Sequence, residues 1–289
     1  MSDWHELHLR TAQPEALSEI LEACGALAVT FSDAEDNPVL EPAPGQTPLW
    51  QHTRVTGLFP GDVDREQVET SLRLGGEAYI LSLQWGDLAE QVWERAWLDH
   101  FQPIDFGQWL RVAPHGAEVP NDQRRTLRLD PGLAFGTGTH PSTALCLEWI
   151  GQHNLEGRTV LDYGCGSGIL AIASAMAGAT EVIACDIDPQ ADTSTRNNAQ
   201  ANHQNITVVS CAQAAQRRYD LVIANILAGI LVELAPTLQG CLNPQGQLLL
   251  AGLLNDQAAL VEDAFPELQF ARYVQGQWCA LLGTLKDCD

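Results

Sequence analysis

The sequence predicts an α/β protein with two domains, in which a smaller α+β unit comes before a larger, mostly parallel sheet. Its 289 residues are enough for about two domains that each bury a core. Residues 4–85 alternate short strand and helix patterns in the order β-α-β-β-α-β, which is the ferredoxin-like arrangement. From residue 160 onward, apolar strands alternate with helical patterns, as is typical of a parallel sheet.

Turn residues and the period of the apolar positions indicate the elements of the first domain. Pro14 suits the first turn of a helix, and Gly25 suits the end of the same helix. Residues 36–48 contain four prolines and are expected to form an extended loop. The expected strands are residues 4–10, 27–31, 54–59 and 78–84, and the expected helices are residues 14–24 and 64–74. No catalytic constellation appears among them, so this domain is expected to serve in recognition.

A helical pattern over residues 87–101 is expected to bridge the two domains. It places Trp93, Trp97 and His100 on one face, at spacings of three and four residues. Such a stripe usually serves packing, although it could also line a partner surface. We therefore predict a recognition domain at residues 1–86, a linker helix at residues 87–104 and a second domain at residues 105–289, which opens with strands at residues 109–113 and 125–129.

The most informative stretch of the second domain is residues 160–168. An apolar strand leads to Asp162 and is followed by Gly164, Gly166 and Gly168. Glycines allow positive φ and let a ligand lie against bare main chain. The helix formers that follow would then direct their first N–H groups at that ligand.

A second apolar strand ends at Asp186, about twenty residues beyond the first glycine, where a carboxylate can accept from both hydroxyls of an adenosine ribose. The spacing Gly-x-Gly-x-Gly differs from the Gly-x-Gly-x-x-Gly of dinucleotide sites. Asp162 would also repel a pyrophosphate, whereas it suits a cationic ammonium such as that of S-adenosylmethionine. At this point the chain resembles the Rossmann-like methyltransferases. The alternative is a glycine-rich turn that only tightens the packing of strand and helix.

Residues 129–143 form a glycine-rich stretch directly ahead of this strand, where a lid over the cofactor would lie. His140 is a candidate general base, but a histidine before a proline at a helix start can equally cap the helix. The residues that could approach or bind a ligand here are Gly132, Gly136, Gly138, Thr139, His140, Ser142 and Thr143.

A third stretch, residues 219–229, is a buried strand that ends at Asn225, and α/β sheets bind their ligands at that end. We expect Asn225 to face the transferred methyl group, although it could simply cap the strand. Methyltransferases that act on nucleobases or glutamine amides carry Asn-Pro-Pro-aromatic here, and the ring stacks on the planar amine. This chain has Ile226, Leu227 and Ala228 instead, which favours an aliphatic amine.

The C-terminal pattern completes a seven-stranded sheet of the Rossmann-like methyltransferase type. The last two strands are too close in sequence for a crossover helix, so they should pair antiparallel at the sheet edge, whereas an NAD-binding domain continues parallel. The expected helices are residues 228–238 and 255–264, and the expected strands are residues 246–251, 270–275 and 278–285.

Together these motifs closely resemble the ribosomal protein L11 methyltransferases (PrmA family). The likeness is carried by residues 129–141, 162–173 and 224–229, and it extends to residues 20–26 and 57–59 of the first domain. It implies an enzyme that uses S-adenosylmethionine to methylate lysine ε-amines and the N-terminal α-amine of one large-subunit ribosomal protein. It also implies that the first domain binds this substrate and that the second holds the cofactor. The chain departs from the family at Ile230, where a proline is common.

The predicted site combines these motifs with the resemblance. Its catalytic residues are Asn225 and, as a possible assistant, His140. Its cofactor-binding residues are Phe135, Gly136, Thr137, Thr139, Thr143, Asp162, Gly164, Gly166, Asp186 and Asn225. No metal site is expected, because the eight cysteines show no ligand spacing and strand alternation separates His5 from His8.

The composition restricts the partners. A formal net charge of −22 argues against direct binding of nucleic acid and is compatible with a basic protein partner, with solubility or with adaptation to salt. No stretch approaches the ~20 apolar residues of a membrane span, and the first residues lack a basic and then apolar leader. The cysteines are scattered along the chain without a Cys-x-x-Cys pair, which favours reduced thiols. We therefore expect a cytoplasmic monomer without membrane association.

Three alternatives remain at this stage. A nicotinamide-dependent oxidoreductase would need the pyrophosphate spacing, which the glycine motif lacks. A binding module without catalysis would not need polar groups that converge on a methyl group. Among enzymes, the alternative is a methyltransferase acting on a small-molecule or other protein amine; the separate first domain and the acidic charge favour a basic protein substrate.

Overall fold

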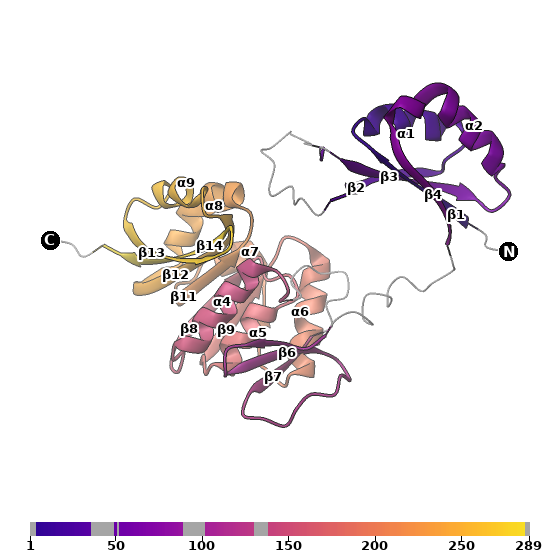
Figure 1. Cartoon of the computed structure of the whole chain (residues 1–289). Coiled ribbons are helices and arrows are strands. Elements are labelled where there is room, and N and C mark those ends of the chain that lie inside the picture. Colours follow the sequence, from indigo (N-terminus) through magenta and orange to yellow (C-terminus); the bar gives the residue numbers. More distant parts are fainter. Residues whose placement is uncertain (1–3, 36–48, 51, 89–101, 130–137, 287–289) are drawn as a thin grey trace. The chain divides into compact units, whose positions relative to one another are not determined.

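The computed structural model describes residues 4–35, 49–50, 52–88, 102–129 and 138–286. The chain divides into two compact units, Met1–Trp93 and Glu94–Asp289 (Figure 1). Most of the predicted linker helix, residues 89–101, lies outside the described residues. Where residues 87–104 are described, the prediction is wrong at both ends. Asp87 lies in a strand paired with His5, where sheet pairing overrides the helical period, and Ile104, beyond the helical pattern, begins another strand.

The first unit is a four-stranded antiparallel sheet with two helices, in the strand order β2-β3-β1-β4. Leu7 and Leu9 on β1 pack with Leu17 of α1 and Leu72 of α2, so the alternating apolar positions of the strands form the core beneath the helices. This confirms the ferredoxin-like prediction. The elements are β1 (Trp4–Thr11), α1 (Pro14–Ala23), β2 (Ala28–Asp33), β3 (Thr53–Pro60), α2 (Arg65–Gly76), a 3-10 turn (Glu77–Tyr79) and β4 (Ile80–Leu88).

The second unit opens with a small sheet of β5 (Ile104–Phe106), β6 (Leu110–Pro114) and β7 (Arg125–Leu129). The sequence patterns predicted β6 and β7 to within one residue but missed the three-residue β5. β6 pairs antiparallel with β5 and parallel with β7. The N–H of Arg128 donates to the side chain of Asn202 at 2.7 Å, which fastens β7 to the end of a helix of the main sheet.

The main sheet has the strand order β10-β9-β8-β11-β12-β14-β13. Its strands run parallel except for β14, which pairs antiparallel with both β12 and β13. The predicted antiparallel pair at the edge is therefore confirmed. Its elements are α4 (Pro141–Gln152), β8 (Thr159–Tyr163), α5 (Ile169–Met176), β9 (Glu181–Cys185), α6 (Pro189–Ala201), β10 (Thr207–Val208), α7 (Cys211–Ala214), β11 (Tyr219–Asn225), α8 (Ala228–Gly240), β12 (Leu242–Leu254), α9 (Ala258–Asp263), β13 (Leu268–Gln275) and β14 (Trp278–Leu285).

Both faces of the main sheet are covered (Figure 1). Helices α4 and α5 pack on the face that contains Val160 and Ile223, and helices α8 and α9 pack on the face that contains Leu161 and Val222. Because neighbouring residues of one strand go to opposite cores, these strands are apolar throughout. Polar side chains at their carboxyl ends are therefore exceptions to the pattern.

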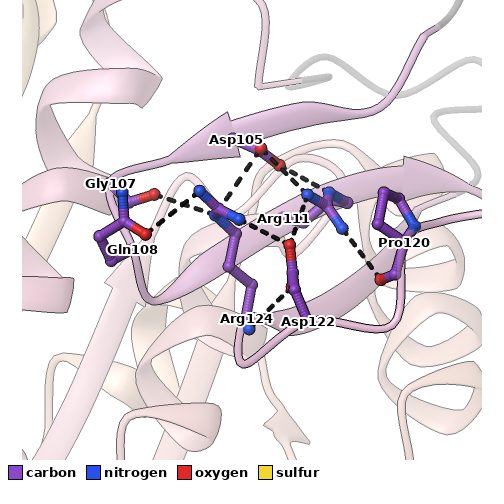
Figure 2. Close-up of polar contacts among 7 residues, drawn as sticks. All are labelled: Asp105, Gly107, Gln108, Arg111, Pro120, Asp122 and Arg124. Carbon is purple, nitrogen blue, oxygen red and sulfur yellow. Dashed lines mark hydrogen bonds and ion pairs between the residues drawn. The ribbon is translucent and has the colours of Figure 1, made fainter.

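A buried arginine holds the small sheet together (Figure 2). Arg111 on β6 is 5% exposed, and its guanidinium donates to both carboxylate oxygens of Asp105 on β5, at 2.6 and 3.0 Å. It also donates to Asp122 at 3.0 Å and to the carbonyl of Pro120 at 3.3 Å. Arg124 adds a bond to Asp122 at 2.6 Å. The network thus joins β5 and β6 to the connection that leads to β7.

Arg111→Met should lower the melting temperature at neutral pH, because it removes the buried cation that donates to both Asp105 and Asp122. Hydrogen bonds from Arg111 hold the pKa of Asp105 below its usual value. An acid with a depressed folded pKa stabilises the fold above its unfolded pKa and loses this contribution as the pH falls through the folded value. The difference in the free energy of unfolding between the unaltered chain and the variant, measured with urea, should therefore be constant from pH 6 to 8. It should shrink below about pH 4.

The matched control is Arg272→Met, since Arg272 also pairs with a carboxylate through two bonds, to Glu262 at 2.6 Å each, but its side chain is 42% exposed. Its loss should have a smaller effect. Equal destabilisation by both variants would contradict the role given to burial.

Candidate functional site

Three polar residues mark the carboxyl ends of three adjacent strands in the main sheet. Asp162 lies on β8, where it is in register with Ala184 of β9 and with Ile223 of β11. Asp186 follows the last residue of β9, and Asn225 is the last residue of β11. Because parallel strands end at one edge, the topology brings these predicted residues to the same edge of the sheet.

The turn after β8 is built from glycine. Gly164, Gly166 and Gly168 all have positive φ, at 81°, 52° and 80°. A Cβ atom on Gly164 would lie 2.6 Å from the side chain of Ile226, so the side chain is excluded by space as well as by conformation. The N–H of Gly164 donates to the carbonyl of Cys185 at 2.8 Å, which fastens the turn to β9. The backbone of the turn is thus fixed and bare, as the sequence predicted.

Asp162 is a buried carboxylate that is only partly satisfied. The residue is 1% exposed, and its Oδ2 accepts from the N–H of Ala171 at 2.9 Å. Its Oδ1 is buried and has no hydrogen-bond partner within the described part of the chain. Burial, with a smaller contribution from the nearby charge of Asp186, raises the pKa of this carboxyl to about 7 against the hydrogen bond from Ala171. Such a group is suited to a cationic donor that would complete its hydrogen bonds.

Asp186 is oriented by backbone groups on both sides. Its Oδ2 accepts from the N–H of Gly166 at 2.9 Å, and its Oδ1 accepts from the N–H of Asp188 at 3.0 Å. Each carboxylate oxygen can accept a second hydrogen bond, so the group can still bind a pair of hydroxyls. The next side chain, Ile187, is 92% exposed. Sequence reasoning did not single out this apolar residue, although its place directly after the acid was visible.

Asn225 is held by a side chain from another element. Its Nδ2 donates to Oγ1 of Thr143 at 3.1 Å, and Thr143 lies in the first turn of α4 and is 1% exposed. The structure therefore brings together two residues that are 82 positions apart and that the sequence placed in one site. With one amide hydrogen engaged, the side-chain oxygen of Asn225 is oriented and can accept a hydrogen bond from a ligand.

His140 caps helix α4. Its Nδ1 accepts from the N–H of Ser142 at 3.3 Å and lies 2.7 Å from the Ser142 hydroxyl. Its ring meets the ring of Trp278 edge to face, with centroids 4.2 Å apart. Burial lowers the pKa of His140, so the ring is neutral at neutral pH. Trp278 was missed because an aromatic residue at the start of the last strand gives no local signal of a contact with a helix so distant in sequence.

The loop before α4 is described only at its end. Phe135, Gly136 and Thr137 lie outside the described residues, whereas Thr139 is exposed. Gly138 has φ +85° and is buried, and a Cβ atom on it would lie 3.3 Å from Ile169 at the start of α5. The end of the loop therefore reaches the helix that follows the glycine turn.

The described residues contain no group of three His, Cys, Asp or Glu side chains that could hold a metal ion. None of their helices is long and apolar enough to cross a membrane.

Comparison with known proteins decides the family. The family model described as ribosomal protein L11 methyltransferase (PrmA) matches residues 3–286. The chain belongs to this family. This confirms the identification made from the sequence motifs, and it agrees with a main sheet of the Rossmann-like methyltransferase type.

Relatives of the PrmA family align over nearly the whole chain. The ribosomal protein L11 methyltransferase of Actinobacillus succinogenes is 43% identical over 293 aligned positions, which cover 98% of this chain and 99% of the relative. The protein of the same name from Pseudomonas putida is 46% identical, with 91% of each chain covered. Among solved structures, the ribosomal protein L11 methylase of Lactobacillus delbrueckii subsp. bulgaricus matches with a TM-score of 0.60 and 34% identity, over 64% of this chain and 100% of that chain.

Asp162→Asn should make the ligand-free chain more stable at neutral pH. The folded pKa of Asp162 is raised, so the folded protein binds its proton more tightly than the unfolded chain does. Stability from this group is therefore present at low pH and is lost as the pH rises from about 4 to about 7. The variant should gain on the order of 3 kcal/mol in urea unfolding at pH 8, and less as the pH is lowered.

Asp220→Asn is the matched control with the opposite sign. Burial acts against the ionised form of Asp220, but hydrogen bonds from Thr159 and Asn243 outweigh burial and hold its pKa below the usual value. That variant should lose stability at neutral pH. A loss of stability at pH 8 for Asp162→Asn would contradict the claim that the buried carboxylate of Asp162 destabilises the fold.

Proposed function

We propose that this PrmA-family chain transfers methyl groups from S-adenosylmethionine to amines of ribosomal protein L11, namely lysine ε-amines and the N-terminal α-amine. The observation that carries the proposal is the buried carboxylate of Asp162, whose second oxygen lacks a partner among the described residues, beside a turn of bare glycine backbone. A pyrophosphate would be repelled there, whereas an amino-acid ammonium completes the hydrogen bonds. No observation favours a small molecule or another protein as the substrate.

The residues present fit this cofactor at both of its ends. Asp162 would accept from the ammonium of the methionine part, and the glycine turn would let that part lie against the main chain. Asp186, already oriented by the N–H groups of Gly166 and Asp188, would accept from the ribose hydroxyls. Ile187 would give the adenine an apolar surface, which explains why such a side chain is left in solvent.

Asn225 would receive the substrate amine. The bound cofactor supplies a methyl group that is already activated as part of a sulfonium. The protein must therefore mainly align a neutral amine and exclude water. An asparagine cannot act as a base, but the oxygen of Asn225 can accept from the amine and fix its direction while Thr143 holds the amide.

The amine must also lose a proton, because a free lysine has a pKa near 10.4 and is cationic at neutral pH. We propose that this proton leaves to water as the amine enters the site. His140 is neutral, but its Nδ1 already caps α4. Its main part is thus to hold the first turn of α4, and with it Thr143, and we propose assistance in proton transfer as a second role.

The first unit would bind the substrate. We propose that residues 1–86 recognise L11 and that residues 105–289 hold the cofactor and the reacting amine. The net charge of −22 suits attraction of a basic protein and disfavours direct contact with nucleic acid. We also propose that the chain works in the cytoplasm, which suits the modification of a ribosomal protein, and that it acts as a monomer.

The deciding experiment is mass spectrometry of ribosomal proteins from a strain that lacks this gene. The proteins are incubated with the purified chain and labelled S-adenosylmethionine. We expect mass gains in multiples of one methyl group on L11 alone, at lysines and at the N-terminus. Mass gains on a different protein would show that the substrate is not L11, although the methyl-transfer reaction would stand. No gain despite bound cofactor would contradict the proposed reaction.

Two variants should separate binding from catalysis. Asn225→Ala removes the group that aligns the amine and should lower kcat by about 100-fold, with little change in the Kd of the cofactor. Asp162→Asn removes the charge that pairs with the ammonium and should raise that Kd by about 30-fold or more. Calorimetry measures the Kd, and a methyl-transfer assay at saturating cofactor measures kcat.

Asn154→Ala is the control for both, because Asn154 is exposed and its side chain accepts from the N–H of Glu156, two residues away. It should change neither quantity. Unchanged turnover of Asn225→Ala would remove Asn225 from the mechanism, and an unchanged Kd for Asp162→Asn would remove Asp162 from the cofactor site.

A further inference from the structure

Two cysteines, Cys185 and Cys211, lie near the carboxyl ends of the strands, on the face of the main sheet that carries α8. Cys185 is the last residue of β9, pairs with Tyr163 of β8 and is fully buried. Cys211 begins α7 and packs against the same buried cluster. The N–H of Val209 donates to the carbonyl of Ala184 at 3.0 Å, which brings the chain that enters α7 to the end of β9. The Cys211 side chain lies in the same cluster as those of Cys185 and Tyr163, and both of these neighbours act on its thiol.

The two thiols differ in exposure and in acidity. Cys211 is half-buried, whereas Cys185 has no exposed surface. The neighbouring Cys185 thiol lowers the pKa of Cys211 to about 7, with a further contribution from Tyr163, against burial and the charge of Asp186. The same contact and burial raise the pKa of Cys185. Cys211 is therefore the nucleophile of the pair at neutral pH, and Cys185 is a protonated thiol in contact with it.

Cys185 also holds the glycine turn. Its carbonyl oxygen accepts from the N–H of Gly164 at 2.8 Å and from the N–H of Cys165 at 3.1 Å, and Asp186 is the next residue. A covalent bond to the Cys185 side chain would act on the backbone group that positions this turn. Neither cysteine belongs to the set proposed to touch the cofactor, so an effect on binding would pass through the backbone of residues 164–186.

We propose that Cys185 and Cys211 form an oxidisable thiol pair, which hydrogen peroxide converts to a disulfide that weakens cofactor binding. The Cys211 thiolate attacks one peroxide oxygen, the O–O bond breaks, and the hydroxide released takes up a proton as water. The Cys185 sulfur then attacks the resulting sulfenic acid; the S–O bond breaks, the S–S bond forms and a second water leaves. Two thiols thereby lose two electrons and two protons, and one peroxide is reduced to two waters.

The test uses the purified full-length chain, treated with hydrogen peroxide and digested with trypsin without reduction. Cleavage after Arg196 and Arg217 leaves Cys185 in the peptide of residues 159–196 and Cys211 alone in the peptide of residues 197–217. We expect these peptides to be linked, with fragment ions that locate the bond at Cys185 rather than at Cys165. Calorimetry on the same sample should show the Kd for S-adenosylmethionine raised about tenfold and restored by dithiothreitol.

Cys211→Ser should yield no linked peptide and should keep its cofactor affinity after peroxide treatment. Cys24→Ser is the matched control, because Cys24 is also half-buried but lies in the first unit. It should behave as the unaltered chain does. The proposal is overturned if peroxide leaves the two peptides unlinked, or if Cys211→Ser loses as much affinity as the unaltered chain.

The effect on affinity rests on the proposed function, but the linkage does not. If the reduced chain fails to bind S-adenosylmethionine, the proposed function falls, and the linked peptides still decide whether the thiol pair exists. If the reduced chain binds it and the linked chain binds equally well, the pair is oxidisable but has no effect on the site, which overturns the second half of the proposal.

Discussion

A carboxylate buried without its full set of hydrogen bonds is the constraint on which the rest of this site depends. Asp162 is surrounded by apolar strand and helix, and within the described residues it is the N–H of Ala171 that offsets its desolvation. Such a group opposes folding at neutral pH. A bound cation removes that cost, so the free energy of ligand binding contains the relief of strain already present in the fold. The surrounding core must be large enough to tolerate this, which the two apolar layers of the main sheet provide.

The geometry around Asp162 follows from the order of the strands. β8 lies between β9 and β11 in the sheet, so Asp162, Asp186 and Asn225 come from the ends of three strands that are direct neighbours. The glycine turn is tied to β9, and Asn225 is tied to α4. The two halves of the site are thereby fixed by different elements: one by the sheet and the other by the helix whose cap is His140. A change at one half need not disturb the other.

Much of this was visible in the sequence because it is local. A strand that ends in an acid, a run of alternate glycines and a strand that ends in asparagine each predict a place at the carboxyl edge, and Asp162, Gly164, Asp186 and Asn225 lie there. What escaped depends on tertiary contact. The partners of Asn225 and His140 are distant in sequence, β5 is too short to show a period, and pairing with β1 decided the conformation of Asp87.

The contact between His140 and Trp278 links the first helix of the main sheet to its last strand. β14 inserts between β12 and β13, so β13 leaves the ribosome before the strand that will separate it from β12. During synthesis, a chain that stops short of β14 already has its glycine turn and both acids, yet lacks the ring that abuts the cap of α4. The order of translation therefore delays this contact at the cap of α4 until the final hairpin has emerged.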